Sequence, residues 1–258
     1  MTQWCFWGDK EFSDVYENIY IRGALEDWFK IVESIAREIN LINGKKMIVD
    51  IGCGEGHSTK QVLDRVKGDY TCDLVEPNKN ALLTAEKMLK VENKIGETYP
   101  LALADFKPDK KYDFIFTSHT NYYWAQNEND YKVQLKKLSS FIHKKGKLII
   151  LTLPKSSDHY KVMLKQSYPD FVYAEYLIDF YKRLGLSVDI KKFNMRMYVG
   201  DILNNHNRFD LSIFYRFIHN TSEPPDNDEV QRFLITLKKF QKKGYLDFRD
   251  YLIIINKK

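Results

Sequence analysis

Seven runs along this chain of 258 residues are either continuously apolar or alternate between apolar and polar positions. Runs of this kind predict β-strands, and those that are apolar throughout predict strands buried on both faces of a parallel sheet. The predicted strands cover residues 47–51, 70–75, 99–104, 112–118, 147–153, 186–198 and 245–255.

The segments between these runs carry apolar residues three or four positions apart, which is the spacing of an amphipathic helix. Asn78 is a favourable N-cap for the helix after the second run, and Gly185 a favourable C-cap further along. The predicted helices cover 24–40, 78–91, 129–143, 174–185, 209–219 and 226–243, and two more begin near residues 57 and 156. Strands that alternate with helices predict an α/β fold with helices on both faces of the sheet.

The stretch Asp50-Ile-Gly-Cys-Gly-Glu-Gly56 begins in the last two residues of the first predicted strand and continues directly after it. Glycine adopts conformations closed to other residues and lets a ligand approach the main chain, so the three alternating glycines predict a ligand-binding turn. The next helix begins near His57, where free amides and the helix dipole favour an anionic group. A dinucleotide-binding fingerprint needs glycine at the position that His57 occupies here, so this glycine pattern differs from that fingerprint. NAD binding, or a fold that binds nothing, stays open as an alternative.

Glu76-Pro77 ends the second predicted strand, where a carboxylate can accept hydrogen bonds from both hydroxyls of a ribose. With the glycine turn and this acid, the sequence resembles the class I S-adenosylmethionine (SAM)-dependent methyltransferases. The resemblance implies SAM as cofactor, S-adenosyl-L-homocysteine as product, and an acid after the third strand that binds adenine. The expected cofactor-binding residues are Asp50, Gly52, Cys53, Gly54, Gly56, Glu76, Pro77, Asp105, Phe106 and Ser118.

The same resemblance implies a Rossmann-like sheet of seven strands that is mostly parallel. Its last strand runs antiparallel between the fifth and sixth, and an N-terminal helical segment forms a lid. One methyltransferase domain is expected over 1–258, with the lid and its helix at 1–44, the cofactor-binding half at 45–153 and the substrate-side half at 154–258. The aromatic residues before position 24 could instead simply cap the core.

The fourth predicted strand ends in His119-Thr-Asn-Tyr-Tyr-Trp124, at the edge of the sheet where this type of fold binds its substrate. The segment lacks the Asn/Asp-Pro-Pro-aromatic motif of enzymes that methylate DNA amino groups, and the Pro-Cys of cytosine-carbon enzymes. Residues 114–127 contain no grouped carboxylates of the kind that would hold magnesium, so no metal is expected.

The segment is more similar to histamine N-methyltransferase and its relatives. That resemblance places His119 at the family's substrate-bonding glutamine and matches Tyr122 and Tyr123 to its tyrosine pair, with Tyr16 and Tyr20 as two N-terminal aromatics. The three residues of the strand tip are therefore the expected catalytic group. His119 could assist deprotonation of an amine or only orient the substrate.

Two further side chains are expected to line the substrate pocket, namely His159 and Phe214. Together with Tyr16, Tyr20, His119 and Tyr123 they complete the predicted substrate site. The expected reaction is transfer of a methyl group to a small molecule, at an amine or imidazole nitrogen. An RNA or protein methyltransferase, or a cofactor-binding partner protein without catalysis, remains an alternative.

Composition changes this interpretation little. The formal net charge is +5, but the lysines are dispersed in pairs, as solvated helix faces would have them, so nucleic acid is not the expected partner. The three cysteines have no metal-ligand spacing, and Cys53 and Cys72 are expected to be small packing residues. The chain has no apolar run long enough to span a membrane and does not begin like a signal peptide, so a cytoplasmic monomer or homodimer is expected.

Overall fold

The computed structural model describes residues 25–90, 94–162, 169–205, 208–219 and 224–257. Its internal contacts divide the chain into two compact units, each built from several stretches. The sheet unit consists of Lys30–Thr152, Asp170–Lys191 and Tyr251–Lys258, and the helical unit lies within 1–29, 153–169 and 192–250. The predicted three-part division of one domain stays a prediction.

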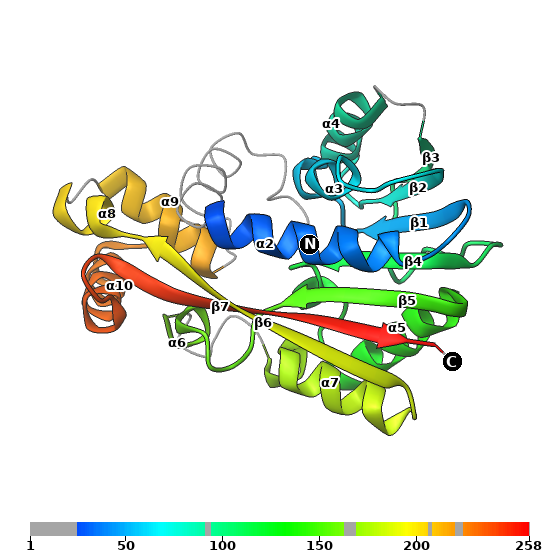
Figure 1. Ribbon diagram of the computed structural model, residues 1–258. Helices are drawn as coiled ribbons and strands as arrows, with labels where there is room; N and C mark the ends of the chain where they lie inside the picture. Colours follow the sequence, from blue (N-terminus) through cyan, green and yellow to red (C-terminus); the bar gives the residue numbers. More distant parts are fainter. Residues whose placement is uncertain (1–24, 91–93, 163–168, 206–207, 220–223, 258) are drawn as a thin grey trace. The chain divides into compact units, whose positions relative to one another are not determined.

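One sheet of seven strands has the order β3-β2-β1-β4-β5-β7-β6 (Figure 1). Strands β1 to β5 pair in parallel, and β7 runs antiparallel to β5. The strands are β1 (Lys46–Ile51), β2 (Tyr70–Val75), β3 (Ile95–Tyr99), β4 (Tyr112–Ser118), β5 (Ile142–Thr152), β6 (Ser187–Tyr198) and β7 (Tyr245–Asn256). The predicted sheet, including a last strand inserted between the fifth and sixth, is confirmed, whereas residues 1–24 of the predicted N-terminal lid lie outside the described residues.

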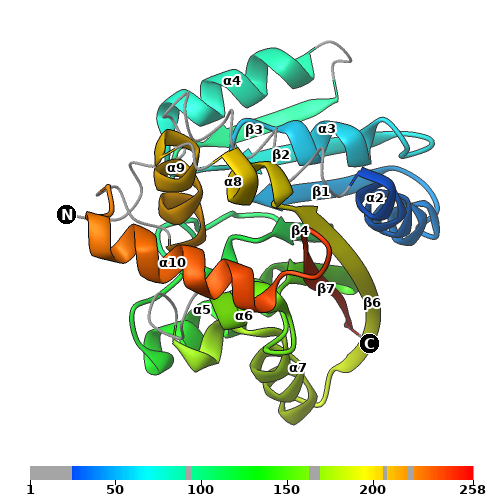
Figure 2. The same ribbon diagram turned by 90° about the vertical axis from the view of Figure 1, so that its left-hand side faces the viewer.

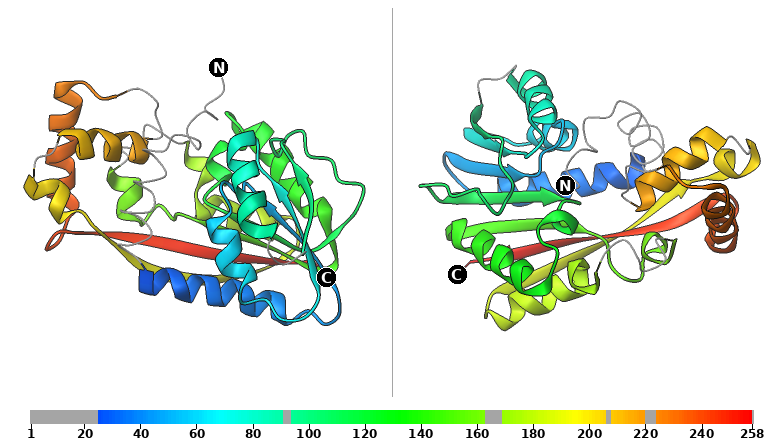
Figure 3. Two further views of the ribbon diagram at one scale, coloured as in Figure 1. Left: turned by 90° about the horizontal axis from the view of Figure 1, so that it is seen from above. Right: turned by 180° about the vertical axis from the view of Figure 1, so that it is seen from behind.

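Helices cover both faces of the sheet within the sheet unit. Those on one face are α2 (Leu25–Asn40), α3 (His57–Leu63) and α4 (Lys79–Leu89), and those on the other are α5 (Glu128–Phe141) and α7 (Ala174–Arg183) (Figures 2 and 3). Short 3-10 turns, η4 (Asn121–Tyr123) and η5 (Asp170–Val172), follow β4 and precede α7. Asn78 caps α4 as predicted, by accepting hydrogen bonds from the Asn80 and Ala81 amides.

The core of the sheet unit lies between these layers. Strands β1, β2 and β4 and the second half of β5 are buried along almost all their length, in agreement with their apolar runs. The apolar stripe of α2 is fully buried at Val32, Ile35 and Ile39 as its spacing predicted, whereas Phe29 of the same stripe is exposed. Each such side chain stabilises the fold by roughly 1.5–3 kcal/mol relative to an exposed one, so the carboxyl ends of these strands are firmly positioned.

The predicted third strand, 99–104, is wrong. The strand is β3, which pairs with β2 from Ile95 to Tyr99, and residues after Pro100 form a turn. Strand β3 is an edge strand and is only half-buried, so its sequence lacks a continuous apolar run that would predict a strand. Gly96 allows the pairing, because a Cβ there would lie 2.3 Å from Asp73 Oδ1.

Other boundaries differ by a few residues. Strand β5 begins at Ile142 rather than Lys147, because α5 ends at Phe141 and the chain enters the sheet through an irregular register opposite Tyr112. The remaining predicted strands and helices are present within a few residues of their predicted ends. Helix α8 (Gly200–Asn205) was not predicted, because its sequence, Gly-Asp-Ile-Leu-Asn-Asn, is too short to show a helical period.

The helical unit contains α6 (Asp158–Val162), α8, α9 (Arg208–His219) and α10 (Asn227–Phe240) (Figure 2). Helix α10 packs against the other three. Asp158 and Ser157, at the start of α6, accept hydrogen bonds from the backbone amides of Asp247 and Arg249 in β7. Among the described helices, none has both the length and the apolar character needed to cross a membrane.

Candidate functional site

The glycine turn after β1 adopts the backbone conformations that its sequence predicted. Gly52, Gly54 and Gly56 have φ values of +79°, +54° and +86°, which favour glycine strongly over other residues. The Gly52 amide donates to the Val75 carbonyl of β2 at 2.7 Å, so the turn is fixed to the neighbouring strand end. A Cβ at Gly54 would meet no described atom within 4 Å, so one side of the turn is open.

Glu76 joins this turn to the next one. Its Oε2 accepts from the Gly54 amide at 3.0 Å and its Oε1 accepts from the Asn78 amide at 2.9 Å. The side chain is buried, and burial raises the pKa of its carboxyl group although both backbone amides oppose the shift. A carboxylate can accept about four hydrogen bonds, so Glu76 retains capacity for ligand hydroxyl groups beside the open face of the turn.

Asp50 belongs to β1, two residues before Gly52 of the turn, and is almost fully buried. The Thr59 hydroxyl, in the first part of α3, donates to its Oδ2 at 2.5 Å. Burial raises the pKa of Asp50 to about 7, Thr59 opposes this, and the nearby negative charge of Glu76 adds to it. The site therefore contains two buried carboxyl groups of the same sign, an arrangement that favours a positively charged ligand.

Asp50 should make the stability of the ligand-free protein depend on pH. Its pKa in the folded protein lies above its ordinary value of 3.8, so its contribution is complete below that value and is lost as pH rises through about 7. Between about pH 5 and about pH 8, wild type should lose roughly 2–3 kcal/mol of unfolding free energy relative to Asp50→Asn, which keeps an oxygen for Thr59. Urea unfolding of both proteins at the two pH values measures this, and parallel pH profiles would rule the assignment out.

The remaining predicted cofactor residues are placed as follows. Cys53 is buried, and burial raises the pKa of its thiol well above the ordinary value, as expected of a packing residue. Pro77 is half-buried directly after Glu76, and Ser118 is half-buried at the end of β4. Their contacts with a cofactor stay predictions.

Asp105 and Phe106 lie on the turn between β3 and β4. Asp105 is exposed, whereas the ring of Phe106 is fully buried and packs edge-on against Tyr99 and Phe141. Lys137 of α5 fixes this turn, because its Nζ donates to the carbonyls of Leu103 and Ala104 at 2.8 and 2.6 Å. Lys137 was not predicted, since a lysine on a helix face has no sequence pattern that links it to a distant loop.

The tip of β4 is held against the glycine turn by Thr120. Its hydroxyl donates to the Ile51 carbonyl at 3.3 Å, and a Cβ at Gly52 would lie only 2.4 Å from Thr120 Cγ2. The sheet unit thus brings His119 and its neighbours next to the predicted cofactor loop. Sequence reasoning missed Thr120, whose role depends on this contact across 69 residues of sequence.

His119 has the left-handed φ of 54°, which is uncommon for a residue with a side chain and tends to occur at functional sites. Its amide donates to the Leu151 carbonyl at 2.9 Å, which fixes the backbone in this conformation. Its Nδ1 lies 3.3 Å from the Tyr122 hydroxyl, and Tyr122 is buried while Tyr123 is half-buried beside it. The tip therefore presents an imidazole and two phenol rings together, as predicted.

The side chain of Asn121 connects the tip of β4 to two neighbouring elements. It is fully buried, and its Nδ2 donates to the Val172 carbonyl at 2.5 Å and to the Tyr131 hydroxyl at 3.3 Å. The side chain thereby ties η4 to η5 and α5. The sequence predicted no separate role for Asn121 within the polar segment after β4, because nothing in the local pattern distinguishes a buried asparagine from a ligand-binding one.

Four predicted substrate residues do not belong to the described part of the sheet unit. Tyr16 and Tyr20 are outside the described residues. His159 and Phe214 belong to the helical unit, where His159 stacks on Phe248 at 4.9 Å and Phe214 is fully buried against Phe233. Their contacts within the helical unit are those of packing residues, and their roles toward a substrate stay predictions.

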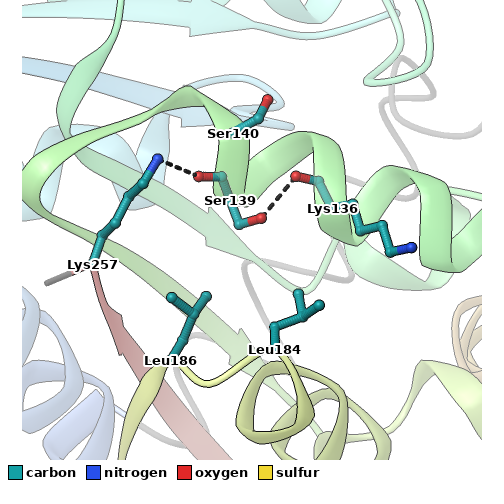
Figure 4. A pocket seen from close by; sticks show the side chains of 6 residues that line it. All are labelled: Lys136, Ser139, Ser140, Leu184, Leu186 and Lys257. Carbon is teal, nitrogen blue, oxygen red and sulfur yellow. Dashed lines mark hydrogen bonds between the residues drawn. The ribbon is translucent and has the colours of Figure 1, made fainter.

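A surface cavity of about 290 Å³ is separate from this site (Figure 4). It lies in the sheet unit and is lined by Lys136, Ser139, Ser140, Leu184, Leu186 and Lys257. Lys257 donates to the carbonyls of Ser139 and Ile142, so it satisfies the carboxyl end of α5 rather than marking a ligand site. None of the predicted site residues lines this cavity.

Comparison with known proteins agrees with the geometry. Residues 29–152 match the family model described as "AdoMet dependent proline di-methyltransferase", AdoMet being SAM. "Uncharacterized protein MJ0906" of Methanocaldococcus jannaschii is 30% identical over 126 residues, which are 48% of this chain and 32% of that protein. The chain thus spans about a third of the length of the curated relative that it matches.

Solved structures share the fold at low sequence identity. The N-methyltransferase NodS of Bradyrhizobium japonicum WM9, in complex with S-adenosyl-L-homocysteine, matches with a TM-score of 0.58 and 11% identity, over 98% of this chain and 94% of NodS. Coclaurine N-methyltransferase, bound to N-methylheliamine and S-adenosyl-L-homocysteine, gives 0.55 and 14%, over 89% and 72% of the two chains. The fold is that of the class I SAM-dependent methyltransferases.

Residues 29–152 and the fold are thus similar to those of SAM-dependent methyltransferases, whose methyl donor is SAM. The residues of the site fit that group, because a buried pair of carboxyl groups and an open glycine turn suit a cationic ligand that carries a ribose. The similarity of the β4 tip to histamine N-methyltransferases concerns the acceptor, and it stays a prediction.

Proposed function

We propose that this chain transfers a methyl group from SAM to a nitrogen atom of a small-molecule amine. One observation carries the proposal: Thr120 holds the polar and aromatic tip of β4 directly against Gly52 of the glycine turn. Glu76 would hold the ribose hydroxyls, and the turn would receive the methionine part of the cofactor. The acceptor would then lie beside His119, Tyr122 and Tyr123.

Bound SAM would supply an electrophilic methyl group on a sulfonium. The protein's contribution is chiefly positioning, because in-line displacement needs the acceptor lone pair about 3 Å from the methyl carbon and aligned with the breaking bond. The phenol rings of Tyr122 and Tyr123 would exclude water and face the cationic centre, while His119 would hydrogen-bond to the substrate. If the substrate amine binds in its neutral form, no residue of the protein has to remove a proton from it before methyl transfer.

The two solved structures are of N-methyltransferases, which favours nitrogen as the accepting atom. The family model, which is named for proline methylation, favours a second candidate, in which the acceptor is the nitrogen of a proline. Methyl transfer from labelled SAM to a panel of small amines, peptides with N-terminal proline and RNA distinguishes these candidates. Transfer to RNA alone would contradict a nitrogen acceptor of the amine type.

His119→Ala should lower turnover of the best acceptor at least about tenfold, as expected for loss of one positioned polar contact of 1.4 kcal/mol or more. The affinity for SAM should stay within about twofold of wild type, because no backbone contact of the glycine turn is removed. Steady-state kinetics and SAM binding are measured in parallel. His143→Ala, at a histidine with a 60% exposed side chain, is the matched control. Unchanged turnover in His119→Ala would remove His119 from the site.

A further inference from the structure

The connection from β3 to β4 has no helix of its own. It consists of residues 100–111, all of which the structure describes. Two parallel strands of one sheet are usually joined by a helix, whose internal hydrogen bonds satisfy the backbone. Here the Ala102 carbonyl accepts from the amides of Asp105 and Phe106, each at 3.0 Å, and closes a single turn. The carbonyls at the centre of that turn therefore need partners from another element.

Lys137 of α5 provides these partners. The two central residues of the turn are Leu103 and Ala104, and neither is a glycine, proline or asparagine that would favour one turn shape. The Lys137 ammonium group donates to both of their carbonyls, at 2.8 and 2.6 Å, across more than 30 residues of sequence. The backbone directly before Asp105 is thus oriented by a side chain on a distant helix.

A different anchor fixes the backbone on the other side of Asp105. Phe106 is fully buried, with its ring centroid 4.9 Å from that of Tyr99 in β3 and 5.5 Å from that of Phe141 in α5. Leu103 is buried as well, whereas Asp105 is exposed. Removal of the Lys137 ammonium would leave both apolar anchors in place, so it should release the carbonyls of the turn without unfolding the sheet unit.

The surroundings of Lys137 differ from those of a solvated lysine. Its side chain is half-buried, and burial lowers the pKa of its ammonium group. The charge of Lys107 lowers this pKa further, while the charge of Asp105 opposes the shift. The Asp105 carboxylate is therefore close enough to Lys137 to interact with it electrostatically. Burial of an ammonium group is unfavourable unless hydrogen bonds compensate, as the two carbonyls do here.

The connection that carries Asp105 begins beside the predicted ribose site. The Glu76 amide donates to the carbonyl of Tyr99, the last residue of β3, at 3.0 Å. The acid that ends β2 and the start of this connection are therefore bonded to each other within the sheet unit. A ribose held by Glu76 carries its base as a direct substituent, so the base would lie near the same connection.

We propose that Lys137 is a positioning residue of the cofactor site: by holding the two central carbonyls of the turn, it fixes the direction of the Asp105 carboxylate and makes the site selective for adenine. This rests on the proposed function, with SAM as methyl donor, and on the predicted contact of Asp105 with the adenine amino group. A carboxylate accepts a hydrogen bond from that amino group but repels the carbonyl oxygen that replaces it in the deaminated base. A carboxylate with no fixed direction would discriminate poorly between them.

The test compares two ligands of the full chain by isothermal titration calorimetry. S-adenosyl-L-homocysteine and S-inosyl-L-homocysteine differ only in the amino or carbonyl group at C6 of the base and in the proton on N1. Wild type should prefer the adenosyl compound by at least about tenfold, as expected for one hydrogen bond to a charged group. Lys137→Met keeps the apolar stem and removes the ammonium, and should reduce this preference below about threefold. An unchanged preference in folded Lys137→Met would overturn the inference.

Two further variants separate positioning from a merely structural role. Lys137→Arg still donates hydrogen bonds and should keep a preference above about fivefold. Lys136→Met alters the exposed neighbour on α5, which lines the separate cavity (Figure 4), and should leave the preference at the wild-type value. If Lys137 only stabilised the fold, Lys137→Met would lower the melting temperature and leave the preference intact, and this result would overturn the inference.

A double variant tests whether Lys137 acts through Asp105. The amide in Asp105→Asn can accept from the amino group or donate to the carbonyl, so this exposed substitution should abolish the preference. Adding Lys137→Met should then change the affinity ratio by less than about twofold. Two independent effects would instead multiply and invert the preference, which would overturn the inference. A wild-type preference in Asp105→Asn alone would overturn it too.

These outcomes distinguish the inference from the function on which it rests. If wild type binds neither compound, the proposed function and the inference are contradicted together. Equal affinity of wild type for the two compounds would overturn only the inference, because the chain would still bind an S-nucleosyl homocysteine.

Discussion

Replacing Glu76 by alanine should weaken SAM binding by about 30- to 1000-fold, which corresponds to roughly 2–4 kcal/mol. The carboxylate accepts hydrogen bonds from the Gly54 and Asn78 amides inside the protein, so its removal leaves two donors without their partner. The same change removes the acceptor proposed for the ribose hydroxyls. Loop geometry and ligand contact are therefore lost together.

Equilibrium dialysis with labelled SAM measures this effect, and circular dichroism shows that the fold is kept. Glu76→Gln should fall between wild type and alanine, because an amide can accept from only one of the two backbone donors. Asp64→Ala is the control, since that carboxylate is well exposed and pairs with Lys60 one helical turn away. Binding of SAM by Glu76→Ala within about twofold of wild type would mean that Glu76 does not hold the cofactor.

The second large effect is expected for Gly52→Ala, which should lower the free energy of unfolding by about 2–4 kcal/mol and weaken SAM binding more than tenfold. A Cβ at Gly52 would lie 2.4 Å from Cγ2 and 2.8 Å from Cβ of Thr120, and the φ of +79° adds backbone strain. The structure can relieve this overlap only by separating the β4 tip from the glycine turn. Binding and stability should therefore fall together.

Gly44→Ala distinguishes the effect of backbone strain at positive φ from the effect of steric overlap with Thr120. Gly44 has a similar φ of +83° at the opposite end of β1, but a Cβ there meets no described atom within 4 Å. The change should lower the unfolding free energy by only about 1–2 kcal/mol, from backbone strain, and leave SAM affinity unchanged. Urea unfolding and SAM binding of both variants provide the comparison. Equal losses in the two variants would show that the Thr120 contact has no special role.

Local features of this site were predictable from the sequence. The glycines of the turn needed positive φ, and the apolar run before them marked the buried strand that carries the turn, so Gly52, Gly54 and Gly56 were found without a structure. Glu76 was found in the same way, as the acid that ends the second apolar run. These signals are local because turn and strand depend on neighbouring residues.

Contacts between distant residues were not predictable. Thr120 against Gly52, Lys137 against the turn before Asp105, and Thr152 against Tyr122 each join separate elements. Threonine and lysine side chains at such positions have no periodicity that distinguishes a structural partner from a solvated residue. The edge strand β3 was misplaced for a related reason, since half-buried strands lack a continuous apolar run.

The substrate side was the least predictable part. His119, Tyr122 and Tyr123 lie at the tip of β4, and the substrate contacts that the resemblance implies for them stay predictions. His159 was predicted from comparable positions in the resembled family and Phe214 from the aromatic-rich segment 209–219, and the structure shows both packed against aromatic partners in the helical unit. Local sequence cannot separate an aromatic residue that packs inside a helical unit from one that lines a substrate pocket.

The central claim is that the glycine turn and Glu76 bind an adenosyl ligand. Isothermal titration calorimetry of the wild-type chain with SAM and with S-adenosyl-L-homocysteine measures this binding directly. One saturable site per chain is predicted for each compound, with each displacing the other. Absence of saturable binding for both compounds, in protein that is folded by circular dichroism, would contradict the assignment of SAM to this site.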